Sequence, residues 1–135
     1  MKEPSSSEYL SKEGYELMAA AFEVHAELNG GLAEEIYQES LQWELHLRVI
    51  SYTSREQLNV FYKGHQLNKK YIPDLLVFDE IVTELKAVKE LLPEHEQQLI
   101  NYMRITKKAV GYLINFGPMK RLQWKRYIIK EFIPK

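Results

Sequence analysis

The sequence predicts one mixed α/β domain, a sheet of about five strands flanked by helices in the order ααβββαββ. Apolar residues recur at helical spacing in residues 13–47 and again after position 93, whereas alternating or β-branched apolar runs occupy the segments between and beyond. At 135 residues the chain can bury a core of its own. We therefore expect a single domain over residues 12–135, preceded by a disordered Ser- and Glu-rich leader over residues 1–11.

Three helices are expected. The first spans residues 13–28 and ends at Asn29-Gly30-Gly31, because these residue types tolerate the left-handed conformation of a helix end. The second spans about 32–47, with Glu34 bordering its inward stripe. The third opens at Pro93, where the missing N–H costs little, and runs to about residue 107. The side chains expected to face inward from the last two helices are Ile36, Tyr37, Leu41, Leu45, Leu99, Tyr102 and Met103.

Strands are expected in five segments, namely 49–62, 69–78, 81–88, 109–116 and 121–133. The first three follow one another through short turns and should form an antiparallel meander. The helix after residue 93 is a connection long enough to make the third and fourth strands parallel. The sheet is therefore predicted to be mixed.

Composition limits the possible chemistry. The absence of cysteine excludes disulfides and thiolate metal sites, which leaves carboxylate, carbonyl and imidazole ligands. The four histidines share no ligand spacing, and we expect them at the surface, with His95 able to approach a site after residue 86. No apolar leader or membrane-length apolar run occurs, so we expect a cytoplasmic protein without membrane contact.

Charge is distributed unevenly along the chain. From residue 104 onward there are nine Lys or Arg residues against one acid, although the whole chain carries a net charge of −1. Such asymmetry suggests a face that meets a polyanion, or two halves that neutralise each other across the fold. The candidate phosphate-binding residues are Lys120, Arg121, Lys125, Arg126 and Lys130, with Trp124 and Tyr127 able to stack on bases.

In the stretch 71–88, two apolar runs meet at a polar turn, Asp79-Glu80. Three charged residues lie inside these runs: Asp74, Glu84 and Lys86. A two-residue turn at Asp79-Glu80 would put Asp74 and Glu84 on opposite faces of the sheet. A three-residue loop, 78–80, pairs Val77 with Ile81 instead and sets Asp74 opposite Glu84, with Lys86 on the same face. We predict this second register or a bulge of equal effect.

Two carboxylates so close repel each other and stay ionised only with a cation between them. Oxygen ligands favour Mg²⁺ or Mn²⁺, which can polarise a phosphate and lower the pKa of a water molecule. Lys86 could orient that water or stabilise developing charge. An internal Asp–Lys–Glu ion network remains the structural alternative.

Pro73-Asp74 followed by Glu84-Leu85-Lys86 resembles the P-D…(D/E)-x-K pattern of restriction-endonuclease-like nucleases. Gly31, Glu34 and Tyr37 spell G-x-x-E-x-x-Y, which resembles the small GxxExxY proteins assigned to that superfamily. The resemblance covers residues 12–132, nearly the whole chain.

The resemblance implies a Mg²⁺- or Mn²⁺-dependent nuclease. It makes Asp74 and Glu84 the metal-binding acids and Lys86 the catalytic lysine, with Glu34 and the Leu85 carbonyl as further ligands. Gln98 and Tyr102 form Q-x-x-x-Y, similar to an exonuclease-type branch, and would join the catalytic residues over the site.

The implied partner is DNA or RNA, and a homodimer is left open. Two alternative interpretations remain: a catalytically silent module that binds nucleic acid or protein, and a structural dimer partner whose carboxylates form only an ion network. The sequence does not distinguish single- from double-stranded substrates, or endo- from exonucleolytic cleavage.

Overall fold

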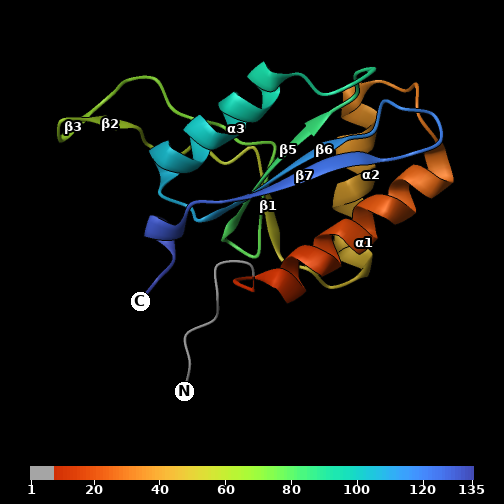
Figure 1. The fold of residues 1–135 in the computed structure, drawn as a ribbon, viewed down its shortest axis with the longest axis horizontal. Coiled ribbons are helices and arrows are strands. Elements are labelled where there is room, and N and C mark those ends of the chain that lie inside the picture. Colours follow the sequence, from red (N-terminus) through yellow and green to blue (C-terminus); the bar gives the residue numbers. More distant parts are fainter. Residues whose placement is uncertain (1–7) are drawn as a thin grey trace.

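The computed structural model describes residues 8–135, which fold into three layers (Figure 1). A five-stranded sheet lies between a pair of helices, α1 and α2, on one face and a single helix, α3, on the other. The elements in chain order are α1 Ser11–Leu28, α2 Glu34–Leu47, β1 Tyr52–Ser54, β2 Phe61–Tyr62, β3 His65–Gln66, β4 Leu75–Val77, β5 Ile81–Lys86, α3 Pro93–Thr106, β6 Val110–Asn115, β7 Gln123–Ile128 and the short 3₁₀ helix η1 Lys130–Phe132.

The sheet has the strand order β1-β4-β5-β6-β7. β1, β4 and β5 form the predicted antiparallel meander, and α3 crosses from β5 to β6, which run parallel. β7 then returns antiparallel to β6. The predicted mixed sheet with flanking helices is confirmed.

The register between β4 and β5 is the one that the three-residue loop requires. Val77 pairs with Ile81 and Leu75 with Thr83, so the next pair outward is Asp74 with Glu84. Phe78 and Asp79 both adopt positive φ, 56° and 61°, which closes the loop within three residues. The register prediction is confirmed.

Two apolar cores form, one on each face of the sheet. The larger lies under α1 and α2 and includes the fully buried Tyr37, Leu41 and Leu45 of α2. The smaller lies under α3, where Leu99 and Met103 pack against the sheet. Ile36, expected to face inward, is 45% exposed, because the stripe of α2 follows positions 37, 41 and 45 and leaves residue 36 at its side.

The N-terminal boundary also differs from the prediction. Residues 1–7 of the expected leader lie outside the described part of the chain. Glu8–Leu10 form a turn, however, and Tyr9 and Leu10 pack against the larger core. Residues 8–10 are therefore part of the fold and not of a disordered leader.

Long strands were predicted where the structure has short ones. Segment 49–62 yields only β1 and β2, because Arg55 takes a positive φ of 52° and its N–H bonds to the Asp74 carbonyl, which ends β1. β2 pairs with β3 in a separate two-stranded hairpin. The last strand ends at Ile128 rather than at residue 133, and η1 follows.

His25 is buried rather than exposed, which corrects the surface prediction for this residue. Its Nε2 lies 2.7 Å from the Pro118 carbonyl, and this contact satisfies the ring inside the larger core. None of the helices in the described residues is long and apolar enough to cross a membrane.

Candidate functional site

The carboxylates of Asp74 and Glu84 meet where β4 begins and β5 nears its end. The Asp74 N–H donates to Glu84 Oε1 at 3.3 Å, and the Leu85 N–H donates to Asp74 Oδ2 at 2.9 Å. Each acid is thus held by the backbone of the opposite strand. This reciprocal contact fixes both carboxylates on one face of the sheet.

Glu84 is held in a setting that disfavours its charge. Burial and the neighbouring charge of Asp74 raise the pKa of Glu84 from 4.5 to about 8, against the opposing effect of a hydrogen bond from Tyr71. The only ion pairs among residues 8–135 are Arg48–Glu44 and Lys125–Glu96. Lys86 pairs with neither carboxylate, so the internal Asp–Lys–Glu network is not formed there.

One oxygen of each acid remains open. Asp74 Oδ1 and Glu84 Oε2 accept no hydrogen bond from the described residues. Neither atom belongs to the buried polar atoms that lack a partner, so both retain contact with solvent. Two accessible carboxylate oxygens on one sheet face are suitable ligands for a hard divalent cation.

Tyr71 is a site residue that the sequence did not single out. Its buried hydroxyl donates to Glu84 Oε1 at 2.8 Å, and its ring stacks on Tyr102 with centroids 3.8 Å apart. Burial and the charge of Glu84 raise the pKa of Tyr71, which keeps its hydroxyl a donor. The sequence did not indicate that Tyr71 shares a face with the acids, because Pro73 interrupts the alternation of the strand between Tyr71 and Asp74.

The predicted Gln98–Tyr102 pair lies beside this contact. Gln98 Nε2 donates to the Tyr102 hydroxyl at 2.6 Å across one turn of α3. Tyr102 is half-buried and reaches the carboxylates only through Tyr71, on which it stacks. The structure therefore places the pair at the wall of the site rather than in contact with the acids.

Glu34 faces the site from the first turn of α2. Burial raises its pKa, and the charge of Asp74 adds to this while Lys86 opposes it. Tyr37 fixes the approach of the helix, because its hydroxyl donates to the Asn29 carbonyl at 2.6 Å and accepts from the Leu32 N–H. The G-x-x-E-x-x-Y residues thus hold the turn that presents Glu34.

Two further residues, Gln38 and Arg55, hold the backbone of Asp74. The buried Gln38 donates from Nε2 to the Asp74 carbonyl at 2.9 Å, and the Arg55 N–H reaches the same carbonyl at 3.3 Å. Arg55 also contacts Gln38 Oε1 at 3.4 Å. Neither residue was predicted, since both contacts depend on how α2 meets the end of β1.

The predicted metal ligands are brought together only in part. No group of three or more His, Asp or Glu side chains within residues 8–135 is arranged to hold a metal ion. Asp74 and Glu84 touch across the strands, whereas Glu34 belongs to the helix layer and faces them without joining a three-acid cluster.

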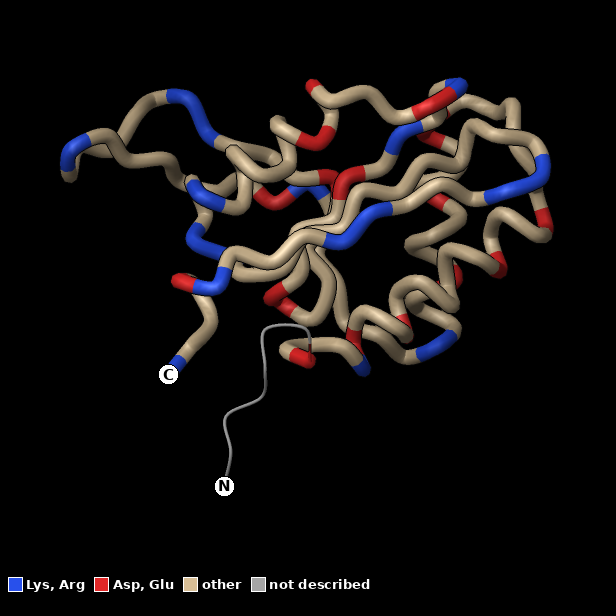
Figure 2. The backbone as a smooth tube through the Cα atoms, viewed as in Figure 1, with Lys and Arg blue, Asp and Glu red and all other residues tan. Residues whose placement is uncertain are grey.

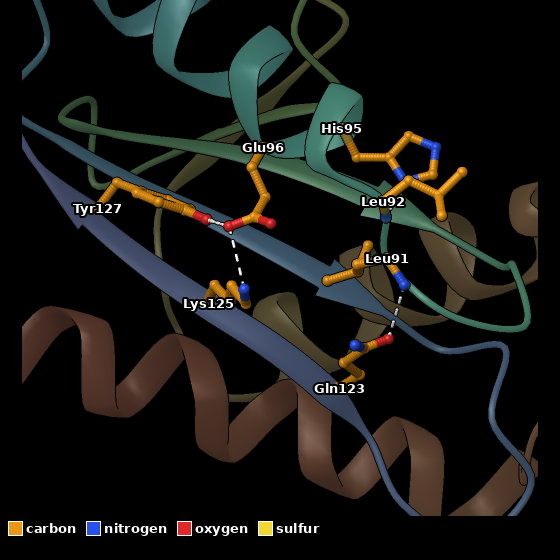
Figure 3. A network of polar contacts seen from close by, with 7 residues as sticks. All are labelled: Leu91, Leu92, His95, Glu96, Gln123, Lys125 and Tyr127. Atoms are coloured by element: carbon orange, nitrogen blue, oxygen red, sulfur yellow. Dashed lines mark hydrogen bonds and ion pairs between the residues drawn. The ribbon is translucent and has the colours of Figure 1, made fainter.

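A polar clamp holds the loop that leads from Lys86 to α3. The buried Asn115 binds both the N–H and the carbonyl of Val88 at 2.9 Å and also contacts Gln123 Oε1 at 3.0 Å. Gln123 Oε1 accepts in turn from the Leu91 N–H (Figure 3). The clamp fixes the chain immediately after Lys86.

The predicted phosphate-binding residues of β7 do not form one row. Lys125 pairs with Glu96 of α3 at 3.0 Å, and the Tyr127 hydroxyl bonds to the same carboxylate (Figure 3). These two donors lower the pKa of Glu96. Arg126 points to the opposite face, 5.9 Å from the Tyr112 ring, and donates to the Tyr9 carbonyl.

The other members of the predicted basic group lie in different surroundings. Lys120 and Arg121 are exposed in the connection between β6 and β7, and Lys130 is exposed at the start of η1. Trp124 is 41% exposed and stacks on Tyr112, on the α1 side. The C-terminal charge is therefore divided between faces.

A cavity of about 510 Å³ opens away from the acids, between α1 and β7. Its lining is mainly apolar and contains no acid: Ser11, Gly14, Tyr15, Met18, Ala19, Phe22, Tyr112, Trp124 and Arg126. Since the cavity has no acid in its lining, the candidate catalytic residues are the carboxylates on the opposite face of the sheet.

His95 caps α3 instead of entering the site. Its Nδ1 accepts from the Leu92 N–H at 3.0 Å, which satisfies one of the free donors before the helix (Figure 3).

Comparison with known proteins identifies a family and a similar fold. The sequence profile described as the PD-(D/E)XK nuclease superfamily matches residues 11–127. No curated protein matches significantly. Among solved structures, the crystal structure of SSO0001 is similar, with a TM-score of 0.55 and 18% identity.

That alignment covers 91% of this chain and 61% of the other, so this chain spans less than two thirds of the length of SSO0001. At this level of identity the likeness shows the fold alone. Because the superfamily profile matches most of the chain, this chain belongs to the PD-(D/E)XK nuclease superfamily.

Proposed function

We propose that this protein is a metal-dependent nuclease of the GxxExxY branch that hydrolyses phosphodiester bonds in nucleic acid. One observation carries the proposal: Asp74 and Glu84 meet across β4 and β5, yet no cationic side chain within residues 8–135 forms an ion pair with either. Lys86 follows two residues after Glu84 on the same strand face.

The donor set suits Mg²⁺ or Mn²⁺. Asp74 and Glu84 would hold the ion through their open oxygens, with the Leu85 carbonyl as a further ligand. Mg²⁺ usually retains several waters and needs only one or two carboxylates, so Glu34 would act through such a water. When bound, the ion supplies positive charge that polarises the scissile phosphate and lowers the pKa of water.

The remaining chemistry comes from the chain itself. The Lys86 ammonium orients the attacking water or stabilises the charge that develops on the phosphoryl oxygens. Tyr71 donates to Glu84 Oε1, so Glu84 Oε2 would be the oxygen that binds the ion. Gln38 and Arg55 prevent the Asp74 backbone from shifting.

The proposal is tested by incubating the purified protein with single- and double-stranded DNA and RNA, in Mg²⁺, Mn²⁺ or EDTA. Cleavage should require the metal ion and should be lost in Asp74→Asn and Lys86→Ala. Two matched variants serve as controls: Asp79→Asn, in the exposed turn of the same hairpin, and Lys89→Ala, on the exposed loop after β5. Both should cleave as the wild type does.

The screen also separates the alternatives. Nucleic-acid binding without cleavage under any metal condition would support a catalytically silent module. Cleavage that survives both Asp74→Asn and Lys86→Ala would place the activity elsewhere or in a contaminant, and would overturn the proposal.

A further inference from the structure

The β2–β3 hairpin and its flanking residues form an arm, residues 57–70, outside the main sheet (Figure 1). β2 and β3 pair only with each other, and residues 61–69 are all exposed. Lys63 and Gly64 at the tip have φ of 49° and 81°. Two such residues in succession are typical of a type I′ turn, whose twist matches that of the strands. The arm is therefore a defined projection.

Its surface carries aromatic rings and positive charge. Phe61 and Tyr62 are each 60% exposed, and the Lys63 ammonium lies 5.4 Å from the centre of the Tyr62 ring. No acid occurs between Glu56 and Asp74, a stretch that contains three lysines. Figure 2 shows blue segments on the arm and no red. Neither aromatic ring contributes to the core clusters.

The base of the arm is attached directly to the carboxylate site. Leu58 and Tyr71 form an antiparallel bridge with N–H···O distances of 2.8 and 2.9 Å, and the Tyr71 hydroxyl donates to Glu84. Leu58 and Val60 pack against the core under α3. At the rise of a β-strand, the tip at Lys63 lies within about 25 Å of Tyr71.

We propose that this arm binds a single strand of nucleic acid that leads to the carboxylate site. Phe61 and Tyr62 are consecutive in β2 and face opposite sides of the hairpin, so each stacks on a different base of a strand that passes around the arm. Lys63 and Lys69 contact phosphates. Lys70 serves the arm itself, because its ammonium donates to Asn59 Oδ1 at 2.6 Å. The inference rests on the proposed nuclease function, since it names the strandedness of that substrate.

The chemistry of the arm favours an unpaired strand. Stacking on a base needs a free π-face, which a duplex hides within its own stack, and such stacking tolerates any sequence. Lysines add an attraction to phosphates that weakens with salt. A hairpin that exposed only lysines would bind a duplex as well as a single strand. The exposed rings of Phe61 and Tyr62 are therefore the reason why we propose an unpaired strand.

Fluorescence anisotropy with a labelled oligothymidylate and a duplex of equal length tests this, in the Lys86→Ala background with Mg²⁺. Phe61→Ala/Tyr62→Ala should weaken binding of the single strand by about tenfold or more. Lys63→Gln/Lys69→Gln should lower the slope of log affinity against log salt by roughly 0.7 per lost contact. Duplex binding should change less in both variants.

Matched controls are Tyr15→Ala, another exposed aromatic residue, and Lys12→Gln/Lys135→Gln, two exposed lysines outside the arm. Both should bind as the parent does, and unchanged melting temperatures would show that all variants fold. Equal losses for duplex and single strand would overturn the preference for an unpaired strand. Unchanged binding in the arm variants, or loss of self-association alone, would overturn the arm as a nucleic-acid site.

The two proposals fail separately. If the wild type cleaves no nucleic acid but binds it through the arm, the nuclease proposal is contradicted and the arm proposal stands. Cleavage by the wild type, with binding that the arm substitutions leave unchanged, would contradict the role of the arm and would support the nuclease function.

Discussion

Glu84 is the acid of the candidate site whose pKa lies furthest above its usual value. It is half-buried beside a second carboxylate. Hydrogen bonds from Tyr71 and from the Asp74 N–H offset part of the cost of burying its charge. A buried acid in this setting keeps its proton unless a cation compensates its charge. Under the proposed function, a metal ion at the site would therefore displace the proton that Glu84 otherwise keeps.

This exchange predicts an unusual pH dependence. The folded pKa of Glu84, about 8, exceeds the ordinary value of 4.5, so the folded state binds the proton more tightly than the unfolded state. That contribution to stability is complete below about pH 4.5 and is lost as the pH rises towards 8. In EDTA, the wild type should lose stability between pH 5 and 8 relative to Glu84→Gln, as measured by thermal unfolding across that range.

Metal ions should oppose this loss of stability with rising pH. The ion requires the deprotonated acid, so the stabilisation by Mn²⁺ should grow from pH 5 to pH 8. Glu90→Gln, at an exposed position on the next loop, is the control and should follow the wild type. Parallel stability curves for wild type and Glu84→Gln in EDTA would show that Glu84 titrates normally.

At the scale of elements, three turns approach one another closely around the end of β5. A Cβ on Gly30 would lie 2.3 Å from the Gly117 carbonyl oxygen, and one on Gly117 would lie 2.0 Å from the Val88 carbonyl oxygen. Only glycine permits these backbones to touch. The contact joins the turn before Glu34 to the loop after Lys86, so it sets the distance between helix and strand groups of the site.

Gly30→Ala should therefore destabilise the protein by about 2–3 kcal/mol, because its backbone neighbours cannot move aside as a flexible side chain can. Gly64→Ala is the control: it meets open space but has φ of 81°, and should cost only about 1 kcal/mol. Urea unfolding at constant pH measures both. A smaller loss for Gly30→Ala than for Gly64→Ala would contradict the close approach.

The elements also show why some predictions succeeded. The β4–β5 register followed from the parity of a three-residue loop, which sequence spacing determines. The same parity argument applies to β7, where neighbours such as Lys125 and Arg126 must face opposite sides. Counting charge along the chain does not take this rule into account, so it could not show that Lys125 and Arg126 lie on different faces.

At the scale of the whole molecule, the fold was predictable because each element is locally consistent with the sheet order. The candidate residues Asp74, Glu84 and Lys86 could be grouped from the sequence because they share one hairpin, whose register is determined by sequence spacing. Tyr71 and Gln38 could not be found, because their contacts arise between elements. The arm was missed because a continuous strand was expected over residues 49–62, whereas Arg55 breaks it.

The most direct test of the cation site is Mn²⁺ binding by isothermal titration calorimetry at pH 8, where the proton on Glu84 competes with the metal ion less than at lower pH. The wild type should bind Mn²⁺, and Asp74→Asn should weaken the affinity by about tenfold or more, since loss of even an outer-shell partner has effects of this size. Asp79→Asn should bind as the wild type does. Equal Mn²⁺ affinity in wild type and Asp74→Asn would contradict the central claim that the opposed carboxylates hold the metal ion.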